Sequence, residues 1–195
     1  MSAVQPELDW LVPPLGPGEI GTASIAFAAG PRTDLFADPA GGEPKTDSPL
    51  LLGRPSGDFQ LRARVAAPLS ATFDAAGLVI WASPTAWGKL ELEYSPQREA
   101  MIVSVVTRGL SDDANGFTVA ESFAWLRVAR SGEAIAFHAS VDGLWWSLVR
   151  SFTFPGAGGA AAGFVVQSPT GDGLHGRFDE IEWTAGPLAQ LRDGS

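Results

Sequence analysis

The chain has 195 residues, of which 23 are Gly and 15 are Pro, and its 22 acidic and 13 basic side chains give a net charge of −9. Gly and Pro both interrupt helices, so this composition excludes a helical bundle, while a hydrophobic share of 45% excludes a disordered chain. The negative charge repels phosphate backbones and anionic lipid, so we expect neither nucleic acid nor a membrane surface as a partner.

Residues with metal-binding or redox chemistry are scarce. The sequence contains no Cys and only two His, so we expect no disulfide framework, no zinc site and no cofactor. No loop has the ordered ligand spacing of a calcium site, although the sequence leaves calcium binding open. No run approaches the roughly 20 apolar residues of a membrane helix. The N-terminal residues are acidic where a signal peptide is basic, so we predict a cytoplasmic protein.

The predicted elements are short strands separated by turns. Residues 1–20 are rich in Pro and are predicted to form an irregular lead-in. A strand near 22–28 is followed by the loop 32–56, which contains four Pro and three Gly. Alternating or apolar runs then predict strands at 58–65, 76–81, 89–94, 102–107, 125–130, 135–140, 145–152, 162–167 and 177–183.

The spacing of these strands predicts the fold class. Turn signals recur about every 8–14 residues, which is typical of an antiparallel β-sandwich. We therefore predict an all-β protein that forms a single domain over residues 1–195. Its sandwich is expected at 21–184 and a tail at 185–195.

A series of short motifs runs in order along residues 20–183. They include Thr33-Asp34-Leu35-Phe36, Gly57-Asp58-Phe59, Phe73-Asp74-Ala75-Ala76-Gly77-Leu78, Trp87-Gly88-Lys89 with Glu93, and Val105-Val106-Thr107 with Ser111-Asp112. Together they resemble the family called domain of unknown function 1349, or regulation-of-enolase-like. The resemblance implies a concanavalin A-like jelly-roll sandwich without a settled activity. Leu35-Phe36 and Asp113 depart from the family pattern, which has Phe-Trp and Trp there.

The clearest candidate site is the polar side of the strand predicted at 89–94. Lys89, Glu91 and Glu93 share one face of this strand, and residues two apart lie roughly 6.6 Å from one another. If the face lines the concave groove of a jelly roll, Glu91 and Glu93 could act as acid and base on a glycosidic bond, with Lys89 holding one of them ionised. The alternative is a solvated sheet face with cross-strand ion pairs.

Tryptophan is abundant, and aromatic faces bind the apolar faces of sugars. Most of these side chains are expected in the core. Trp87 lies where a loop meets a strand, and Trp125 shares a strand side with Arg127. These two are therefore the best candidates for exposed stacking residues.

Four further residues complete the predicted site. Asp34 lies in the long loop, Arg127 lies on the polar side of its strand, and His138 and Ser140 share a side with a small neighbour. Arg127, Ser140 and Asp34 are predicted to hold ligand hydroxyls. His138 has a suitable pKa for a general base, although a structural, hydrogen-bonded histidine is the alternative.

Three functional hypotheses follow. The first is a lectin-like protein that binds a carbohydrate or similar polar small molecule in the groove. The second is an enzyme acting on a sugar-like substrate there, with Glu91 or Glu93 as acid or base and His138 assisting. The third is a regulatory protein whose partner is a metabolic enzyme, as the alternative name of the resembled family suggests. The residues alone leave open whether the protein is an enzyme.

Overall fold

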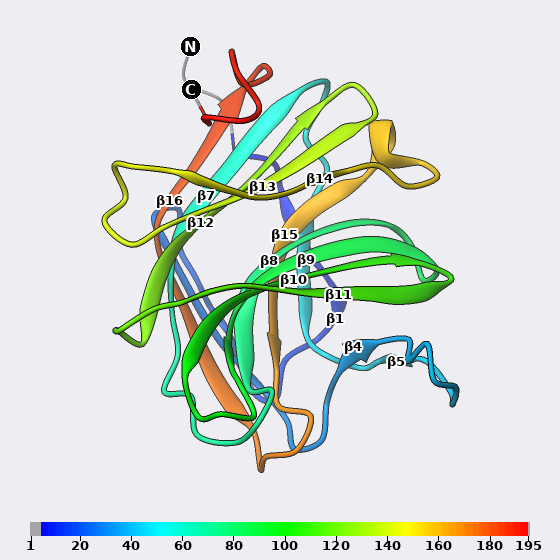
Figure 1. Cartoon of the computed structure of the whole chain (residues 1–195), viewed down its shortest axis with the longest axis vertical. Coiled ribbons are helices and arrows are strands. Elements are labelled where there is room, and N and C mark those ends of the chain that lie inside the picture. The colour runs from blue at the N-terminus through cyan, green and yellow to red at the C-terminus, as the bar shows by residue number, and fades with distance from the viewer. Residues whose placement is uncertain (1–4, 195) are drawn as a thin grey trace.

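The computed structural model describes residues 5–194 and confirms the predicted fold class (Figure 1). The chain forms an antiparallel jelly-roll β-sandwich with seven strands in each of two sheets. The helical structure described is a single short 3-10 turn, η1 (Ala157–Gly159). Among the described residues, no helix is long and apolar enough to cross a membrane.

Sheet I is defined by its strand order. It runs β1 (Leu8–Val12), β6 (Leu50–Gly53), β15 (Ala161–Gln167), β8 (Ala75–Ser83), β9 (Ala86–Tyr94), β10 (Ala100–Arg108) and β11 (Leu110–Thr118). The predicted irregular lead-in at 1–20 is wrong in two places, because β1 pairs with β6 at the edge of this sheet and β2 (Glu19–Ile20) pairs with β3 (Ser24–Ala29). β11 is a strand that the periodicity did not predict.

Sheet II packs against sheet I. It runs β14 (Ser147–Phe152), β13 (Ala134–Ser140), β12 (Phe123–Ser131), β7 (Phe59–Ala66), β16 (Leu174–Ala185), β3 (Ser24–Ala29) and β2 (Glu19–Ile20). β4 (Leu35–Phe36) and β5 (Lys45–Thr46) pair with each other outside both sheets, as Figure 1 shows.

The core between the sheets is built by alternation. Leu90 and Leu92 of β9 and Leu126 and Val128 of β12 belong to one buried apolar cluster that both sheets contribute to. Because neighbouring residues of a strand point to opposite faces, the residues between them point away from this core. The sandwich therefore has two outer faces, one on each sheet.

The outer face of sheet I is partly covered by residues 33–38, which we call the strap. Thr33 bridges Ser168, just after β15, and Ala37 exchanges hydrogen bonds with Ser111 of β11. The strap thus crosses β8, β9 and β10. The side chain of Leu35, a residue of the strap, is fully buried. It belongs to a second apolar cluster that also contains Trp81 and Trp87.

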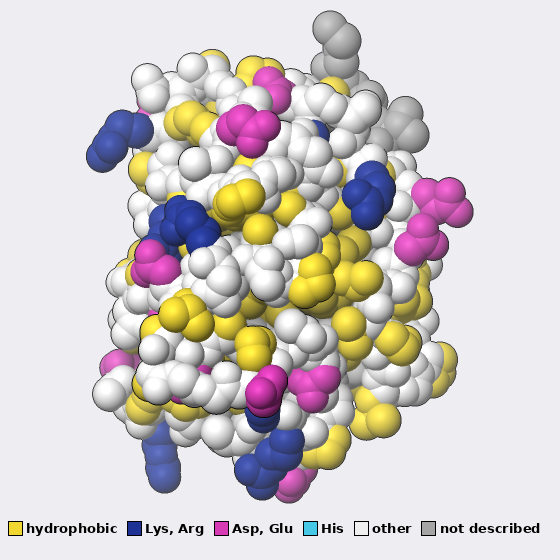
Figure 2. Space-filling view, turned by 90° about the vertical axis from the view of Figure 1, so that its right-hand side faces the viewer, with side chains coloured by type: hydrophobic (Ala, Val, Ile, Leu, Met, Phe, Trp, Pro, Cys, Tyr) yellow, Lys and Arg dark blue, Asp and Glu magenta, His cyan; other side chains and the backbone are white. Residues whose placement is uncertain are grey.

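Figure 2 shows one side of the molecule, on which apolar side chains gather across the middle. The Lys and Arg side chains on this side stand apart from one another. This side therefore shows no continuous basic patch.

Candidate functional site

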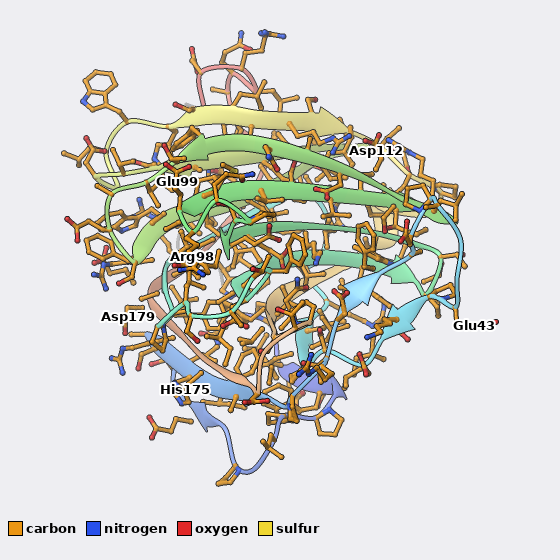
Figure 3. All side chains as sticks on the ribbon, turned by 60° about the horizontal axis from the view of Figure 1, so that its bottom comes forward. Glu43, Arg98, Glu99, Asp112, His175 and Asp179 are labelled. Atoms are coloured by element: carbon orange, nitrogen blue, oxygen red, sulfur yellow. The ribbon has the colours of Figure 1, made fainter. Side chains whose placement is uncertain are left out.

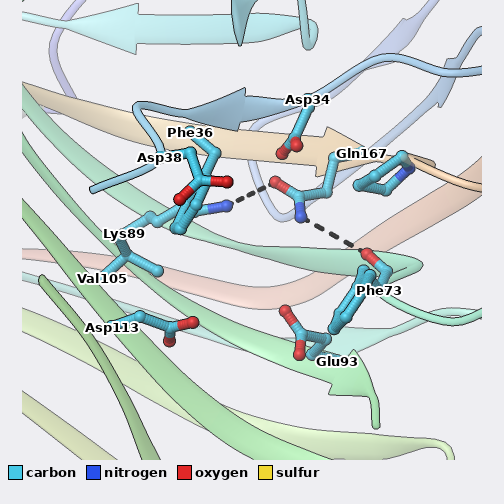
Figure 4. A pocket seen from close by; sticks show the side chains of 10 residues that line it. Asp34, Phe36, Asp38, Phe73, Lys89, Glu93, Val105, Asp113 and Gln167 are labelled. Atoms are coloured by element: carbon cyan, nitrogen blue, oxygen red, sulfur yellow. Dashed lines mark hydrogen bonds between the residues drawn. The ribbon is translucent and has the colours of Figure 1, made fainter. Parts of the chain in front are cut away.

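A cavity of about 330 Å³ opens on the outer face of sheet I beside the strap. The strap, four strands and two loops all contribute to its lining. The lining residues are Asp34, Phe36, Asp38, Phe73, Lys89, Glu93, Val105, Asp113, Gln167 and Pro169 (Figure 4). This volume is at the lower end of the range for small-molecule sites.

β9 supplies the floor of the cavity. Lys89, Glu91 and Glu93 point to the outer face, as the alternation predicted, and Lys89 and Glu93 line the cavity. Their expected exposure is wrong for two of them, because Lys89 is 1% exposed and Glu91 0%. Both are buried under the strap rather than in the core between the sheets.

Lys89 and Glu91 form a buried ion pair. Nζ of Lys89 lies 2.9 Å from Oε2 of Glu91, and it also donates a hydrogen bond to Oε1 of Gln167. Burial lowers the pKa of Lys89, but the carboxyl groups of Glu91 and Asp34 outweigh it, so this pKa lies above its ordinary value. Lys89 is therefore charged and already partnered.

Glu93 carries the most perturbed carboxyl group of the cavity. Burial, and then the negative charge of Glu91, raise its pKa to about 8. Burial likewise raises the pKa of Asp34 on the strap, although Lys89 opposes this shift. At neutral pH the carboxyl group of Glu93 is therefore mostly protonated, whereas that of an ordinary glutamate is ionised.

Small residues on the neighbouring strand make room for these side chains. Gly77 of β8 lies opposite Glu91, and Ala75 lies opposite Glu93. A Cβ atom added at Gly77 would stand 2.1 Å from the carbonyl oxygen of Leu90 and 2.8 Å from Cα of Glu91. The glycine of the motif at 73–78 is thus required by the close approach of β9.

Phe73 forms one wall and was missed as a site residue. It is 40% exposed and has φ of 70°, a left-handed conformation that is rare for an aromatic residue. The next residue, Asp74, is fully buried and fixes this turn, because it accepts hydrogen bonds from Ser168 Oγ at 2.7 Å and Ala71 N at 2.8 Å. The Phe-Asp pair of the motif therefore holds an aromatic ring at the cavity.

Gln167 connects the floor to that wall. It lies at the end of β15, accepts from Lys89, and donates from Nε2 to the carbonyl oxygen of Phe73 at 3.3 Å. Both hydrogen bonds are drawn in Figure 4. The sequence did not predict Gln167 as a site residue, because a single glutamine at the end of an apolar strand belongs to no recognisable motif.

Asp113 and Asp38 complete the acidic lining. In Figure 4 the carboxyl groups of Glu93 and Asp113 point toward one another, and Asp34 lies above them on the strap. Asp113 and Phe36 stand at the two places where the motifs depart from the resembled family's pattern. Both line the cavity, so these departures alter its chemistry directly.

Four other predicted site residues lie on the wrong sheet for this cavity. Trp125 and Arg127 belong to β12 and His138 and Ser140 to β13, and both strands are in sheet II. The prediction of one shared groove is therefore wrong. Alternation determines whether a side chain points inward or outward, but it does not determine which sheet a strand joins.

The C-terminal segment covers this second outer face. Arg127 donates to the carbonyl oxygen of Gly194 at 2.7 Å, and its guanidinium lies over the ring of Trp146. Nε2 of His138 lies 2.7 Å from the carbonyl oxygen of Leu191. Burial lowers the pKa of His138 to about 4, so its imidazole is neutral near pH 7.

The two tryptophans predicted to be exposed have structural contacts. Trp87 is 1% exposed and stacks on Trp81 with ring centroids 6.4 Å apart, so this prediction is wrong for Trp87. Trp125 is half-buried and donates from Nε1 to Glu180 at 3.0 Å. Ser140 is buried in a turn, where it accepts from the backbone of Gly143.

The fold and the cavity define a jelly-roll β-sandwich protein with a small acidic pocket on one outer face. The family model "Protein of unknown function (DUF1349)" matches residues 10–186, and the chain belongs to that family. The chain is 32% identical over 147 residues to "Regulation of enolase protein 1" of Saccharomyces cerevisiae, covering 74% of this chain and 73% of the yeast protein.

Solved structures share the fold. A functionally unknown protein from Saccharomyces cerevisiae aligns with a TM-score of 0.82 at 24% identity, over 92% of this chain and 96% of that one. The GH43 protein BlXynB from Bacillus licheniformis aligns with a TM-score of 0.68 at 17% identity. The alignment covers 84% of this chain but only 33% of BlXynB. An alginate lyase from Klebsiella pneumoniae gives a TM-score of 0.55 at 12% identity, over 84% and 81% of the two chains.

Proposed function

We propose that the protein binds a polar small molecule, a carbohydrate or a similar polyhydroxylated compound, in the cavity of sheet I. The observation that carries this proposal is the cavity itself, because it joins aromatic side chains with buried groups that can hold hydroxyls. Phe36 and Phe73 offer apolar surface, and Glu93 and Gln167 offer hydrogen bonds. This combination suits a sugar, whose rings have apolar C–H faces and polar edges.

The protonation state of Glu93 supports a hydroxyl-bearing ligand. A hydroxyl group both donates and accepts hydrogen bonds. With its pKa raised to about 8, the carboxyl group of Glu93 is protonated at neutral pH and donates a hydrogen bond, while the carboxyl oxygens of Asp38 can accept one. The cavity therefore offers donors and acceptors side by side.

Binding is tested by titrating the protein with a panel of monosaccharides and sugar alcohols under NMR observation. A true ligand shifts the resonances of Phe73 and Gln167. Phe73→Ala should lower the affinity for this ligand about tenfold, because an aromatic contact is lost. Glu43→Gln is the matched control, because Glu43 is exposed on the loop between β4 and β5 and points away from the body in Figure 3. A panel that shifts no cavity resonance contradicts the proposal.

Hydrolysis in the same cavity is a second candidate, and Glu93 is the observation that favours it. A carboxyl group that is protonated near pH 7 fits the general acid of a glycosidase. Glu91, the predicted partner, is fully buried and paired with Lys89, which disfavours direct contact with a substrate. Chromogenic glycosides test this candidate: turnover abolished by Glu93→Gln supports it, and turnover unchanged by this variant contradicts it.

Regulation through a protein partner is a third candidate. The name of the yeast relative points to enolase, and one turn of this chain is unusually apolar and exposed: Val141 is 62%, Leu144 78% and Trp145 82% exposed. Exposed aromatic residues often anchor protein interfaces. Purified yeast enolase that binds the protein, but not the Trp145→Ala variant, supports this candidate. Equal binding of both proteins contradicts the assignment to this turn.

The cytoplasmic location expected from the sequence stays a prediction. None of the three candidates depends on it.

A further inference from the structure

The cavity of sheet I holds more acidic than basic groups. Four of the described side chains that line it are carboxylic acids: Asp34, Asp38, Glu93 and Asp113. Lys89 is the one base among the described lining residues, and it is already partnered by Glu91 and Gln167. The cavity therefore presents more carboxyl groups than basic side chains.

We propose that the ligand is a cation, a polyhydroxylated amine of about monosaccharide size, whose ammonium group lies between Glu93 and Asp113. This inference rests on the proposed function, since it names the class of polar small molecule that the cavity takes. An ammonium group donates three hydrogen bonds and accepts none. It therefore suits a site where carboxyl oxygens face one another, as those of Glu93 and Asp113 do in Figure 4.

The geometry favours an organic cation over a metal ion. The four carboxyl groups come from three separate parts of the chain, namely the strap, β9 and β11. Across residues 5–194, no group of three acidic or imidazole side chains is placed to hold a metal ion. A water molecule occupies about 30 Å³ of liquid, so a cavity of about 330 Å³ has room for a whole molecule.

A buried carboxyl group below the cavity gives an independent indication. Glu91 is 0% exposed and lies on β9 between Lys89 and Glu93, both of which line the cavity. Its Oε1 has no hydrogen-bond partner among the described residues. A buried carboxyl oxygen without a partner is costly, and a positive charge in the cavity above it would lower that cost.

The aromatic walls fit the same ligand class. Phe36 on the strap and Phe73 on the opposite loop both line the cavity. The face of a phenyl ring attracts a cation and also packs against the C–H groups of a carbon chain. Together the rings and the acids accommodate a molecule that is cationic at one end and carries hydroxyls along its length.

Binding of a cation has a proton signature. Burial and the charge of Glu91 raise the pKa of Glu93 to about 8, with Asp113 and Asp34 contributing and Lys89 opposing. Asp38 is the other charged group of the strap that faces the cavity, and the β15 side contributes only Gln167 and Pro169. Near pH 7 Glu93 is therefore mostly protonated, so an ammonium group that stabilises its charged form expels protons on binding.

The test compares D-glucamine with D-glucitol by isothermal titration calorimetry on the full chain near pH 7. The two probes differ in one group, an ammonium in place of a hydroxyl. Titrations in phosphate and in HEPES, whose heats of ionisation differ, measure the protons released. We expect D-glucamine to bind at least about tenfold more tightly than D-glucitol, and to release protons as it binds.

Two variants test whether Glu93 is responsible for the preference for D-glucamine and for the proton release. Glu93→Gln removes the charge but keeps the shape, so it should abolish both the preference for D-glucamine and the proton release. Glu43→Gln removes an exposed acid elsewhere and should leave both unchanged. Thermal unfolding of each variant shows whether it folds.

The outcomes separate this inference from the proposed function. Equal affinities for the two probes, or D-glucamine binding without proton release, overturn the cationic ligand and leave a polyol site in place. Failure of both probes to bind at millimolar concentration overturns the inference, and with it the proposed binding of polyhydroxylated molecules. A preference that survives in Glu93→Gln also overturns the placement of the ammonium group.

Discussion

The two outer faces of the sandwich start from the same pattern and end as different surfaces. On each, alternate residues of a strand point polar side chains away from the core, Lys89 and Glu93 on sheet I and Arg127 and His138 on sheet II. On sheet I the strap crosses the face and leaves a cavity beside it. On sheet II the carbonyl groups of Leu191 and Gly194 are bonded to the polar side chains. The segment that covers a polar strand face thus decides whether the face keeps an open cavity or is closed by hydrogen bonds.

The largest effect should come from closing the space under the cavity. Gly77→Ala places a methyl group 2.1 Å from a backbone oxygen and 2.8 Å from Cα of Glu91, and neither atom can move away cheaply. We expect a loss of about 5 kcal/mol or more in the free energy of unfolding, or failure to fold. Gly159→Ala is the control, because no atom lies within 4 Å of its added methyl group. Chemical denaturation measures both, and equal stabilities would contradict the packing of β8 on β9.

The buried ion pair should give the next largest effect. Lys89→Met leaves the carboxyl group of Glu91 buried without its partner, and we expect the free energy of unfolding to fall by about 3–5 kcal/mol. The double variant Lys89→Met with Glu91→Leu removes both charges and should recover most of this loss. A double-mutant cycle by denaturation gives the coupling, and additive losses would show that the pair does not interact.

The two faces should respond to pH in opposite directions, and Glu93 is the first test. Its pKa is about 8 in the folded protein and near 4.5 when unfolded, so the folded state binds more protons between these values. Stability contributed by the protonated carboxyl group is therefore lost as the pH rises through this window. We expect Glu93→Gln to be more stable than the parent by about 1–2 kcal/mol at high pH, and the gain to vanish near pH 4.

His138 on sheet II should show the opposite slope. Its pKa is about 4 in the folded protein against 6.5 when unfolded, so the unfolded state binds more protons between these values. Stability is then lost as the pH falls through this window, by about 1–3 kcal/mol. His138→Asn removes this contribution, so the stability of the parent relative to His138→Asn should fall as the pH falls from 7 to 4. A difference between parent and variant that stays constant over this range would contradict the burial of a neutral imidazole.

The smallest effect should be that of a substitution on sheet II on the affinity for a cavity ligand. Trp125 is bonded to Glu180 on sheet II and does not line the cavity. Trp125→Ala should therefore change the affinity for a cavity ligand by less than about twofold, whereas Phe73→Ala weakens it about tenfold. Calorimetric titration of both variants measures this. A comparable loss in Trp125→Ala would mean that the predicted single groove describes the binding site better than the cavity does.

Strand alternation predicted the fold class and the outward direction of the candidate site residues. The outward direction of Lys89, Glu91 and Glu93 follows from period-two spacing, and so does the outward direction of Arg127 and His138. The pairing of strands far apart in sequence does not follow, so the two groups could not be assigned to separate sheets. β11 escaped prediction because it is an edge strand with polar residues such as Asp112 and Asp113 on it, and it lacks an apolar stripe.

The sequence also did not predict that the strap covers part of the outer face of sheet I. Trp87 looked exposed because it stands at a loop–strand junction, yet Trp81 stacks on it and it lies in the cluster beneath the strap. Whether a residue of an outer face is exposed depends on a segment about 50 residues earlier in the chain. The strap is held in place by the pairs Thr33–Ser168 and Ala37–Ser111, which no local sequence pattern predicts.

The most direct measurement is a crystal structure of the protein soaked with D-glucamine. The central claim is that the outer face of sheet I, and not that of sheet II, holds a small polar ligand. We predict density for one molecule between Phe36 and Phe73, with its nitrogen within about 3 Å of a carboxyl oxygen of Glu93. An empty cavity with the molecule bound against Arg127 and His138, or no bound molecule at saturating concentration, would contradict it.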